Sequence, residues 1–173
     1  MASLVLTGDT SGQVTLAAPA VAGTNTITLA AQTGTLNVAG PAFSATRTAA
    51  QSISAATWTK VQFSTEEFDT ANCYDPTTNY RFTPNVAGYY FITSTVETNA
   101  SSLSGVAIYK NGSVYRRMWS SNPSVGASSV ISTTIYMNGT TDYVESYVYQ
   151  NIANPLYTTS PDYEFSGCLL RGA

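Results

Sequence analysis

The chain has 173 residues, enough for one domain or for one domain with an appendage. Only 10% of the residues are charged, the formal net charge is −3, and the seven basic residues are scattered along the chain. This distribution lacks the basic stripe on which nucleic-acid binding depends. No apolar stretch approaches the ~20 residues of a membrane span, so membrane insertion is not expected.

The polar character of the chain comes from neutral side chains, with 26 threonines and 20 serines. Threonine, tyrosine and valine all favour strands. A surface covered by hydroxyl groups also lacks the charge repulsion that keeps chains apart. The composition therefore predicts an all-β protein with much surface available for association.

The first forty residues form a distinct region, in which Asp9 is the only charged residue and no aromatic residue occurs. Two alternating stretches, QVTLAA (13–18) and NTITLAA (25–31), lie between turn-forming residues and predict strands. The region has too few large side chains for a core of its own. We expect residues 1–40 to be an extended or short-stranded arm, ordered by pairing with copies of itself or by docking on a larger assembly. The alternative is a disordered tail.

The remainder, residues 41–173, contains all twenty aromatic residues and is predicted to be the folded head. Short strands at close spacing, without an extended helical pattern, indicate a β-sandwich or barrel. Asn111-Gly112 predicts a two-residue type I′ hairpin, and Asn138-Gly139 marks a second turn. Strands are predicted at residues 57–63, 89–97, 105–110, 113–119, 128–137, 142–150 and 162–170.

An ordered series of motifs runs through the head. The series comprises AFSA (42–45), WTKVQF (58–63), FDTANCYD (68–75), FTPNVAGYYF (82–91), VAIYKNGSV (106–114) and FSGCLL (165–170). It resembles the globular head of complement subcomponent C1q and its relatives in the tumour-necrosis-factor superfamily. The resemblance implies a ten-stranded jelly-roll sandwich that packs as a homotrimer. In the first forty residues, the stretch GDTSGQVTLAAPAVAGTNTITLAAQTGTLNV (8–38) resembles short modules of bacteriophage tail-fibre and other virion proteins.

The strand that begins at Tyr89 is apolar on both of its faces. It follows a turn that ends at Gly88, where we expect backbone angles that a bulky residue would resist. Side chains alternate along a strand, so Tyr89 and Phe91 face one side, whereas Tyr90 and Ile92 face the other. The opposite sheet can cover one side. The other side requires a neighbouring chain or, as the alternative, a loop of the same chain above Tyr90.

A second strand shows the same feature, because Tyr147 and Tyr149 alternate with Val148. Burial of one aromatic side chain is worth about 2–3 kcal/mol. A few rings from each of three chains could therefore outweigh the entropy of association. The predicted trimer interface consists of Tyr89, Tyr90, Phe91, Ile92, Tyr147 and Tyr149.

The sequence leaves little room for catalysis, because it contains no histidine. Histidine-dependent nucleophilic mechanisms and histidine-ligated metal sites are therefore excluded. No phosphate-binding glycine loop occurs, and a carboxylate pair for glycoside cleavage is the one hydrolytic option left. Cys73 and Cys168 are expected to be free thiols, although a fold that brings them together would allow a disulfide. We expect a protein that is not an enzyme and has no cofactor.

Two further sites are considered, each with an alternative. Oxygen-rich loops could bind Ca²⁺, which the resembled family binds near its trimer axis; the alternative is that these aspartates cap turns. The loop at residues 116–126 could contact a receptor, since aromatic and arginine side chains suit sugar or protein surfaces, unless Trp119 packs in the core. The candidate calcium ligands are Asp69, Asp75 and Asp142. The candidate receptor residues are Arg116, Arg117, Trp119 and Asn122.

The combined interpretation is a non-enzymatic, trimeric virion surface protein, a bacteriophage fibre or spike. The arm would attach to other virion proteins, and the head would bind a host receptor, a glycan or another virion protein. The alternative is a capsid decoration or cement protein that stabilises the virus head. A secreted signalling ligand is less favoured, because the N-terminus lacks the features of an export signal. The expected location is the surface of the virion, after assembly in the host cytoplasm.

Overall fold

The computed structural model describes residues 3–7, 11–17, 40–98, 103–121, 127–156 and 163–173. The chain divides into two compact units, Met1–Gly34 and Thr35–Ala173. In the first unit, strands β1 (Ser3–Thr7) and β2 (Gln13–Ala17) form an antiparallel hairpin. The strand predicted at 13–18 is therefore confirmed, whereas the one predicted at 25–31 lies outside the described residues.

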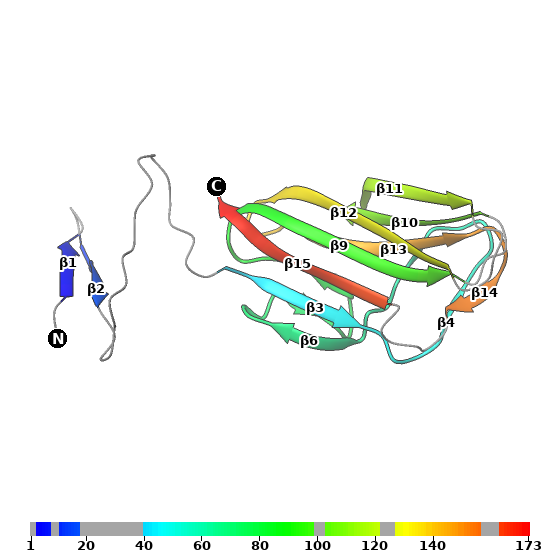
Figure 1. The fold of residues 1–173 in the computed structure, drawn as a ribbon, viewed down its shortest axis with the longest axis horizontal. Coiled ribbons are helices and arrows are strands. Elements are labelled where there is room, and N and C mark those ends of the chain that lie inside the picture. Colours follow the sequence, from blue (N-terminus) through cyan, green and yellow to red (C-terminus); the bar gives the residue numbers. More distant parts are fainter. Residues whose placement is uncertain (1–2, 8–10, 18–39, 99–102, 122–126, 157–162) are drawn as a thin grey trace, which may run out of the picture. The chain divides into compact units, whose positions relative to one another are not determined.

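The second unit is a sandwich of two antiparallel sheets (Figure 1). In the five-stranded sheet, β9 lies between β12 and β15, and β3 and β6 follow on the far side of β15. Its strands are β12 (Ala127–Met137), β9 (Gly88–Thr98), β15 (Tyr163–Gly172), β3 (Ala42–Thr46) and β6 (Thr65–Asp69).

The six-stranded sheet has the order β11-β10-β13-β8-β7, and β5 also pairs with β13. Its strands are β11 (Ser113–Ser121), β10 (Leu103–Lys110), β13 (Val144–Gln150), β8 (Arg81–Phe82), β7 (Tyr74–Asp75) and β5 (Thr59–Lys60). A small third sheet pairs β4 (Gln51–Ile53) with β14 (Asn154–Leu156).

The all-β sandwich predicted from the sequence is confirmed. Within the described part of the chain, the two main sheets together have eleven strands, whereas ten were predicted. Three of the eleven contain only two residues each, and the long stretch predicted at 57–63 contributes only β5. No helix among the described residues is long and apolar enough to cross a membrane.

Aromatic rings fill the space between the two sheets. Phe43 stacks on Phe82 with ring centroids 4.4 Å apart and on Tyr74 at 5.0 Å, and it meets Phe165 edge to face. Phe82 also packs edge to face against Tyr90. These rings come from both sheets, so the hydrophobic effect holds the two layers together without a disulfide.

The β10–β11 connection is the two-residue hairpin that the sequence predicts. Lys110 pairs directly with Ser113, and both intervening residues have positive φ, 52° at Asn111 and 77° at Gly112. A type I′ turn requires these angles, which asparagine and glycine tolerate best. The turn therefore sets the register of the adjacent pairs, and a β-bulge two pairs further on shifts the register so that Ile108 pairs with Arg116.

Gly88 is needed for a different reason from the one expected. The φ angle of Gly88 is not positive, so the conformational freedom of glycine does not explain why glycine occurs here. A Cβ atom at this position would instead collide with the carbonyl oxygen of Arg171 and with the side chain of Leu169. Glycine is required because β15 passes too close for any side chain.

Candidate functional site

Strand β9 presents an apolar side chain on each face, but only one face is covered by the protein itself. Tyr90 and Ile92 are 0% exposed, because they point into the sandwich. Tyr89 is 43% exposed and Phe91 is 39% exposed. The prediction of Tyr90 and Ile92 as trimer-interface residues is therefore wrong: inward-facing side chains on β9 pack against the opposite sheet and have no surface left for a partner.

The exposed rings of β9 belong to a larger group, which we call the outer aromatic face: Tyr89, Phe91, Tyr136, Cys168 and Leu170. All five are exposed, and they come from the three neighbouring strands β9, β12 and β15. Tyr89 and Tyr136 are paired across the strands, with ring centroids 5.5 Å apart. The face therefore lies on three paired strands, from the edge strand β12 to the central strand β15, and not on a loop.

An open hollow of about 440 Å³ lies on the outer aromatic face, lined by Tyr89, Thr134, Leu170 and Arg171. The guanidinium of Arg171 lies 5.6 Å from the centre of the Tyr89 ring and is the one charge beside it among these residues. Contiguous exposed rings are unusual on a monomeric protein and mark surfaces that bind another macromolecule. The hollow is open to solvent and combines the Tyr89 and Leu170 side chains with the polar Thr134 and Arg171.

The two tyrosines predicted on β13 lie on a different surface. The register places Tyr147 and Tyr149 on the outer side of the six-stranded sheet, because the alternating residue Val148 is fully buried. Tyr147 stacks on Tyr109 at 3.8 Å, and Tyr149 packs against Trp58 and Trp119. The six predicted interface residues are thus divided among the core and two outer faces.

The candidate receptor residues lie on a strand rather than in a loop. Arg116, Arg117 and Trp119 all belong to β11, the edge strand of the six-stranded sheet, and Asn122 lies outside the described residues. The expectation of a receptor loop is wrong for the first three, because the hairpin at Asn111 extends the β-ladder through Ser121. Trp119 is 42% exposed, so the alternative of a core tryptophan is also wrong.

The three candidate calcium ligands accept hydrogen bonds from their own surroundings. Asp69 accepts from the backbone N–H groups of Ala71, Cys73 and Tyr74. Asp75 accepts from the N–H groups of residues 77–79, which hold the pKa of its carboxyl well below the usual value. Within the described ranges, no group of three or more acidic or cysteine side chains could hold a metal ion. The geometry is that of the alternative, turn-capping aspartates.

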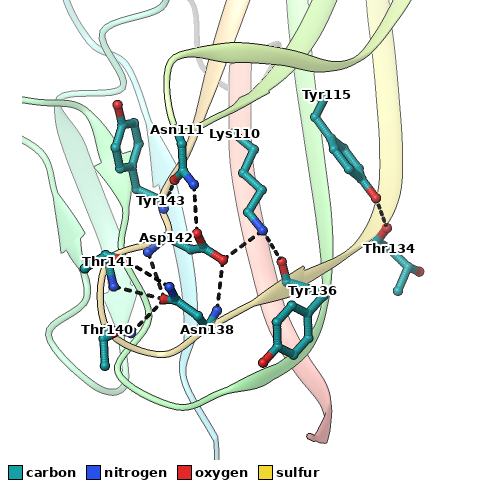
Figure 2. Close-up of polar contacts among 10 residues, drawn as sticks. All are labelled: Lys110, Asn111, Tyr115, Thr134, Tyr136, Asn138, Thr140, Thr141, Asp142 and Tyr143. Carbon is teal, nitrogen blue, oxygen red and sulfur yellow. Dashed lines mark hydrogen bonds and ion pairs between the residues drawn. The ribbon is translucent and has the colours of Figure 1, made fainter.

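Asp142 is the centre of a polar cluster that joins two turns (Figure 2). Its carboxylate accepts from Lys110 Nζ at 2.8 Å, from the Asn111 side chain at 2.7 Å and from the Asn138 N–H at 3.0 Å. Burial acts to raise the pKa of Asp142, but the bonds from Lys110 and Asn111 outweigh it and lower the pKa. The cluster keeps the β10–β11 and β12–β13 turns together.

The same cluster covers the open edge of β12. Lys110 Nζ also donates to the carbonyl of Tyr136 at 2.7 Å, and the Tyr115 hydroxyl donates to the carbonyl of Thr134 at 3.2 Å (Figure 2). Unpaired strand edges attract other strands, so side chains that occupy these carbonyls disfavour edge-to-edge pairing. Sequence reasoning identified the two Asn-Gly turns but missed the lysine, because its partners are 26 and 32 positions away in the chain.

Both cysteines are free, as expected, but they differ in environment. Cys73 is buried, and burial raises the pKa of its thiol. Cys168 is exposed on the outer aromatic face and pairs with Phe91 across the strands. A thiol reagent can therefore report on one face of the sandwich.

Comparison with solved structures shows the same fold in several proteins. Murine APRIL aligns with a TM-score of 0.61 and 14% identity, over 76% of this chain and 100% of APRIL. The globular domain of zebrafish complement 1qA aligns with a TM-score of 0.56 and 18% identity, over 78% of this chain and 100% of that one. The PRD1 vertex protein P5 aligns with a TM-score of 0.57 and 18% identity, over 76% of this chain and 98% of that one.

These structural likenesses establish the jelly-roll fold, which the resemblance of the sequence had implied. Among curated protein sequences, none matches the chain significantly. A family model of the C1q domain matches residues 42–170, which is nearly the whole sandwich and about three quarters of the chain. The chain belongs to the C1q domain family.

Proposed function

We propose that this chain is a non-enzymatic, homotrimeric surface protein of a bacteriophage virion. The head projects from the particle and binds a host receptor, and residues 1–40 attach the trimer to other virion proteins. The observation that carries the proposal is the outer aromatic face, an apolar surface that a single subunit leaves uncovered.

Trimer formation would bury this face. Each fully buried aromatic side chain contributes about 2–3 kcal/mol, and Tyr89, Phe91 and Tyr136 are all available in each subunit. In a three-fold ring, one patch of a subunit contacts a different patch of the next, so the hollow beside Tyr89 can receive a side chain from the neighbour. Three weak receptor sites on one rigid trimer then bind with avidity.

The N-terminal unit supports an attachment role. It is compact by itself, and its hairpin exposes Val5 and Leu6. An isolated two-stranded hairpin is only marginally stable in water, so the segment gains stability when it packs against another protein or against its own copies. Within the described residues, β1 and β2 pair with each other alone, so another strand could extend either edge.

The mass of the purified protein tests the trimer. Light scattering at micromolar concentration is expected to give three times the 18.3 kDa of the chain. A monodisperse monomer would overturn the proposal. For attachment, a chain lacking residues 1–40 is expected to remain trimeric but to be lost from purified particles, whereas full occupancy of the particle would exclude the arm as the anchor.

A second candidate is a decoration or cement protein of the capsid. It is favoured by the likeness in fold to a protein described as a vertex protein, at 18% identity. The two candidates differ in the consequence of removing the protein from the particle. Loss of adsorption, reproduced by competition with free trimer, indicates a receptor-binding protein. Particle rupture with unchanged adsorption indicates cement.

A further inference from the structure

Three aromatic rings from distant parts of the chain meet on the outer side of the six-stranded sheet. Trp58 precedes β5, Trp119 lies on β11 and Tyr149 lies on β13. Their centroids are 5.2 Å apart for the tryptophan pair, 5.6 Å for Trp58–Tyr149 and 4.8 Å for Trp119–Tyr149. We call this group the ring platform. It shares no residue with the outer aromatic face.

Gly105 forms the floor of the ring platform. It pairs with Trp119 on one side and with Tyr149 on the other. A Cβ atom at Gly105 would lie 2.8 Å from the carbonyl oxygen of Met118 and 3.0–3.1 Å from both tryptophan rings. Because Gly105 has no side chain, the rings can pack directly against the sheet. The platform is therefore held by a rigid scaffold, as a preorganised binding surface requires.

The charged groups beside the ring platform differ in whether they form an ion pair. Lys60 and Glu145 form an ion pair at 2.8 Å, so their charges are compensated. Arg117 lies on the same side of β11 as Trp119, with its guanidinium 5.8 Å from the centre of the Trp119 ring. It is exposed and, in the part of the chain that the structure describes, forms no ion pair. Among the described residues, Arg117 is thus a positive charge without an ionic partner at the edge of the platform.

Tyr147 adds a hydrogen-bonding group on the same side of the sheet. Its hydroxyl lies 3.4 Å from Glu145 Oε2, and burial together with the Glu145 carboxylate raises the pKa of Tyr147 to about 12. At neutral pH the hydroxyl is protonated, as it would be at the ordinary tyrosine pKa of about 10. Its ring stacks on Tyr109, which extends the aromatic surface beyond the tryptophans.

We propose that the ring platform binds a carboxylated sugar residue of a surface polysaccharide; this inference rests on the proposed function, since it names the class of receptor for the same head. Sugar rings expose C–H groups on one face and hydroxyl groups at the rim, which matches aromatic rings bordered by polar side chains. The planar guanidinium of Arg117 pairs with a carboxylate through two parallel hydrogen bonds. A single carboxylated sugar residue would make both contacts, with its ring on Trp119 and its carboxylate on Arg117.

The size and charge of the platform favour this ligand over a protein partner. A stable protein interface buries about 800 Å² on each side, far more than three half-covered rings provide. In the described part of the chain, the charge without an ionic partner here is the single Arg117, which suits one carboxylate at a time. A repeated acidic polysaccharide would occupy all three heads of a trimer with weak individual contacts.

Tryptophan fluorescence provides a specific test, because Trp58 and Trp119 are the two tryptophans of the chain and both lie in the platform. The full-length protein is titrated with three carboxylated oligosaccharides, from polygalacturonate, alginate and hyaluronan, and with their methyl esters. At least one acid is expected to change the emission in a saturable way. Its methyl ester is expected to bind at least tenfold more weakly. Equal binding of acid and ester, or no response to any of the three acids, would overturn the inference.

Two adjacent arginines provide a matched pair of variants. Arg117→Gln is expected to weaken binding of the acid at least tenfold and to remove its salt dependence. Arg116→Gln is the control, because Arg116 lies over the Tyr115 ring instead and successive side chains of a strand point to opposite sides. Equal losses in the two variants would overturn the role of Arg117. Light scattering on the same samples separates the outcomes: a trimer that binds no acid refutes only this inference, whereas a monomer refutes the proposed assembly.

Discussion

Both outer faces of the sandwich carry exposed aromatic rings, but the packing of the rings and the charges beside them differ between the two faces. On the five-stranded sheet, Tyr89, Phe91 and Tyr136 are exposed, and Tyr89 and Arg171 line an open hollow. On the six-stranded sheet, the rings of the platform pack against one another and are bordered by charged side chains. A surface with little internal packing gains most from a large apolar partner, whereas a self-packed surface with polar borders suits a small polar ligand.

The largest expected effect separates these two faces directly. Phe91→Glu would place a carboxylate on the outer aromatic face, where association would have to remove the charge from water. We expect the trimer to dissociate to 18.3 kDa subunits that remain folded, as measured by light scattering and circular dichroism. Val114→Glu is the control, since Val114 is equally exposed but lies at the β10–β11 turn. Dissociation of both variants, or of neither, would contradict the assignment of the interface.

Reactivity of Cys168 sharpens the same comparison without altering an aromatic residue. In a Cys73→Ala background, we expect a maleimide reagent to label Cys168 at least tenfold more slowly in the assembled protein than in the Phe91→Glu variant. The reason is that Cys168 lies opposite Phe91 on the face that the trimer would bury. Labelling is followed by mass spectrometry. Equal rates in the two proteins would show that this part of the face stays open to solvent.

A substitution of Asp142 tests how much the polar cluster stabilises the end of the sandwich where the two sheets are joined. Asp142→Asn leaves Lys110 without its ionic partner and is expected to lower the free energy of unfolding by about 1–3 kcal/mol at neutral pH. The folded-state pKa of Asp142 is lowered, so its stabilisation is present above the unfolded pKa of about 3.9 and is lost as the pH falls through the folded pKa.

The difference between Asp142→Asn and the unaltered protein should therefore shrink in acid. Urea unfolding at equal protein concentration, at neutral pH and at a series of pH values below the unfolded pKa of about 3.9, measures this difference. Glu66→Gln is the matched control, because Glu66 is exposed on β6 and forms no ion pair among the described residues. A difference that stays constant with pH would show that the charge of Asp142 contributes nothing.

The smallest expected effect concerns the contact between the inner faces of the two sheets. Ser94 on β9 and Ser146 on β13 are both fully buried and share a hydrogen bond of 2.7 Å. Ser94→Ala removes one partner and is expected to lower the free energy of unfolding by about 1–2 kcal/mol, because the other hydroxyl stays buried and unpaired. The double variant Ser94→Ala/Ser146→Ala is expected to be less destabilised than the two single changes added together. Simple additivity in urea unfolding would refute this coupling.

Local features of the fold were predictable because their causes are local. The Asn111-Gly112 hairpin depends on the angles that two adjacent residues tolerate, and the strand at Tyr89 depends on an unbroken run of strand-forming side chains. The alternation of Tyr89 and Phe91 against Tyr90 and Ile92 was also correct. Which pair faces the core was not predictable, because a period of two gives the same pattern in either orientation.

The composition and spacing of this sequence determined an all-β head with excess apolar side chains, preceded by an uncharged arm without aromatic residues. Only the tertiary structure decided where these excess apolar side chains lie. It buries Tyr90 and Ile92, exposes Tyr89 and Phe91, and gathers Trp58, Trp119 and Tyr149 onto Gly105. The reason is that strand pairing joins residues tens of positions apart. Their contacts depend on register and sheet order, which no short stretch of sequence contains.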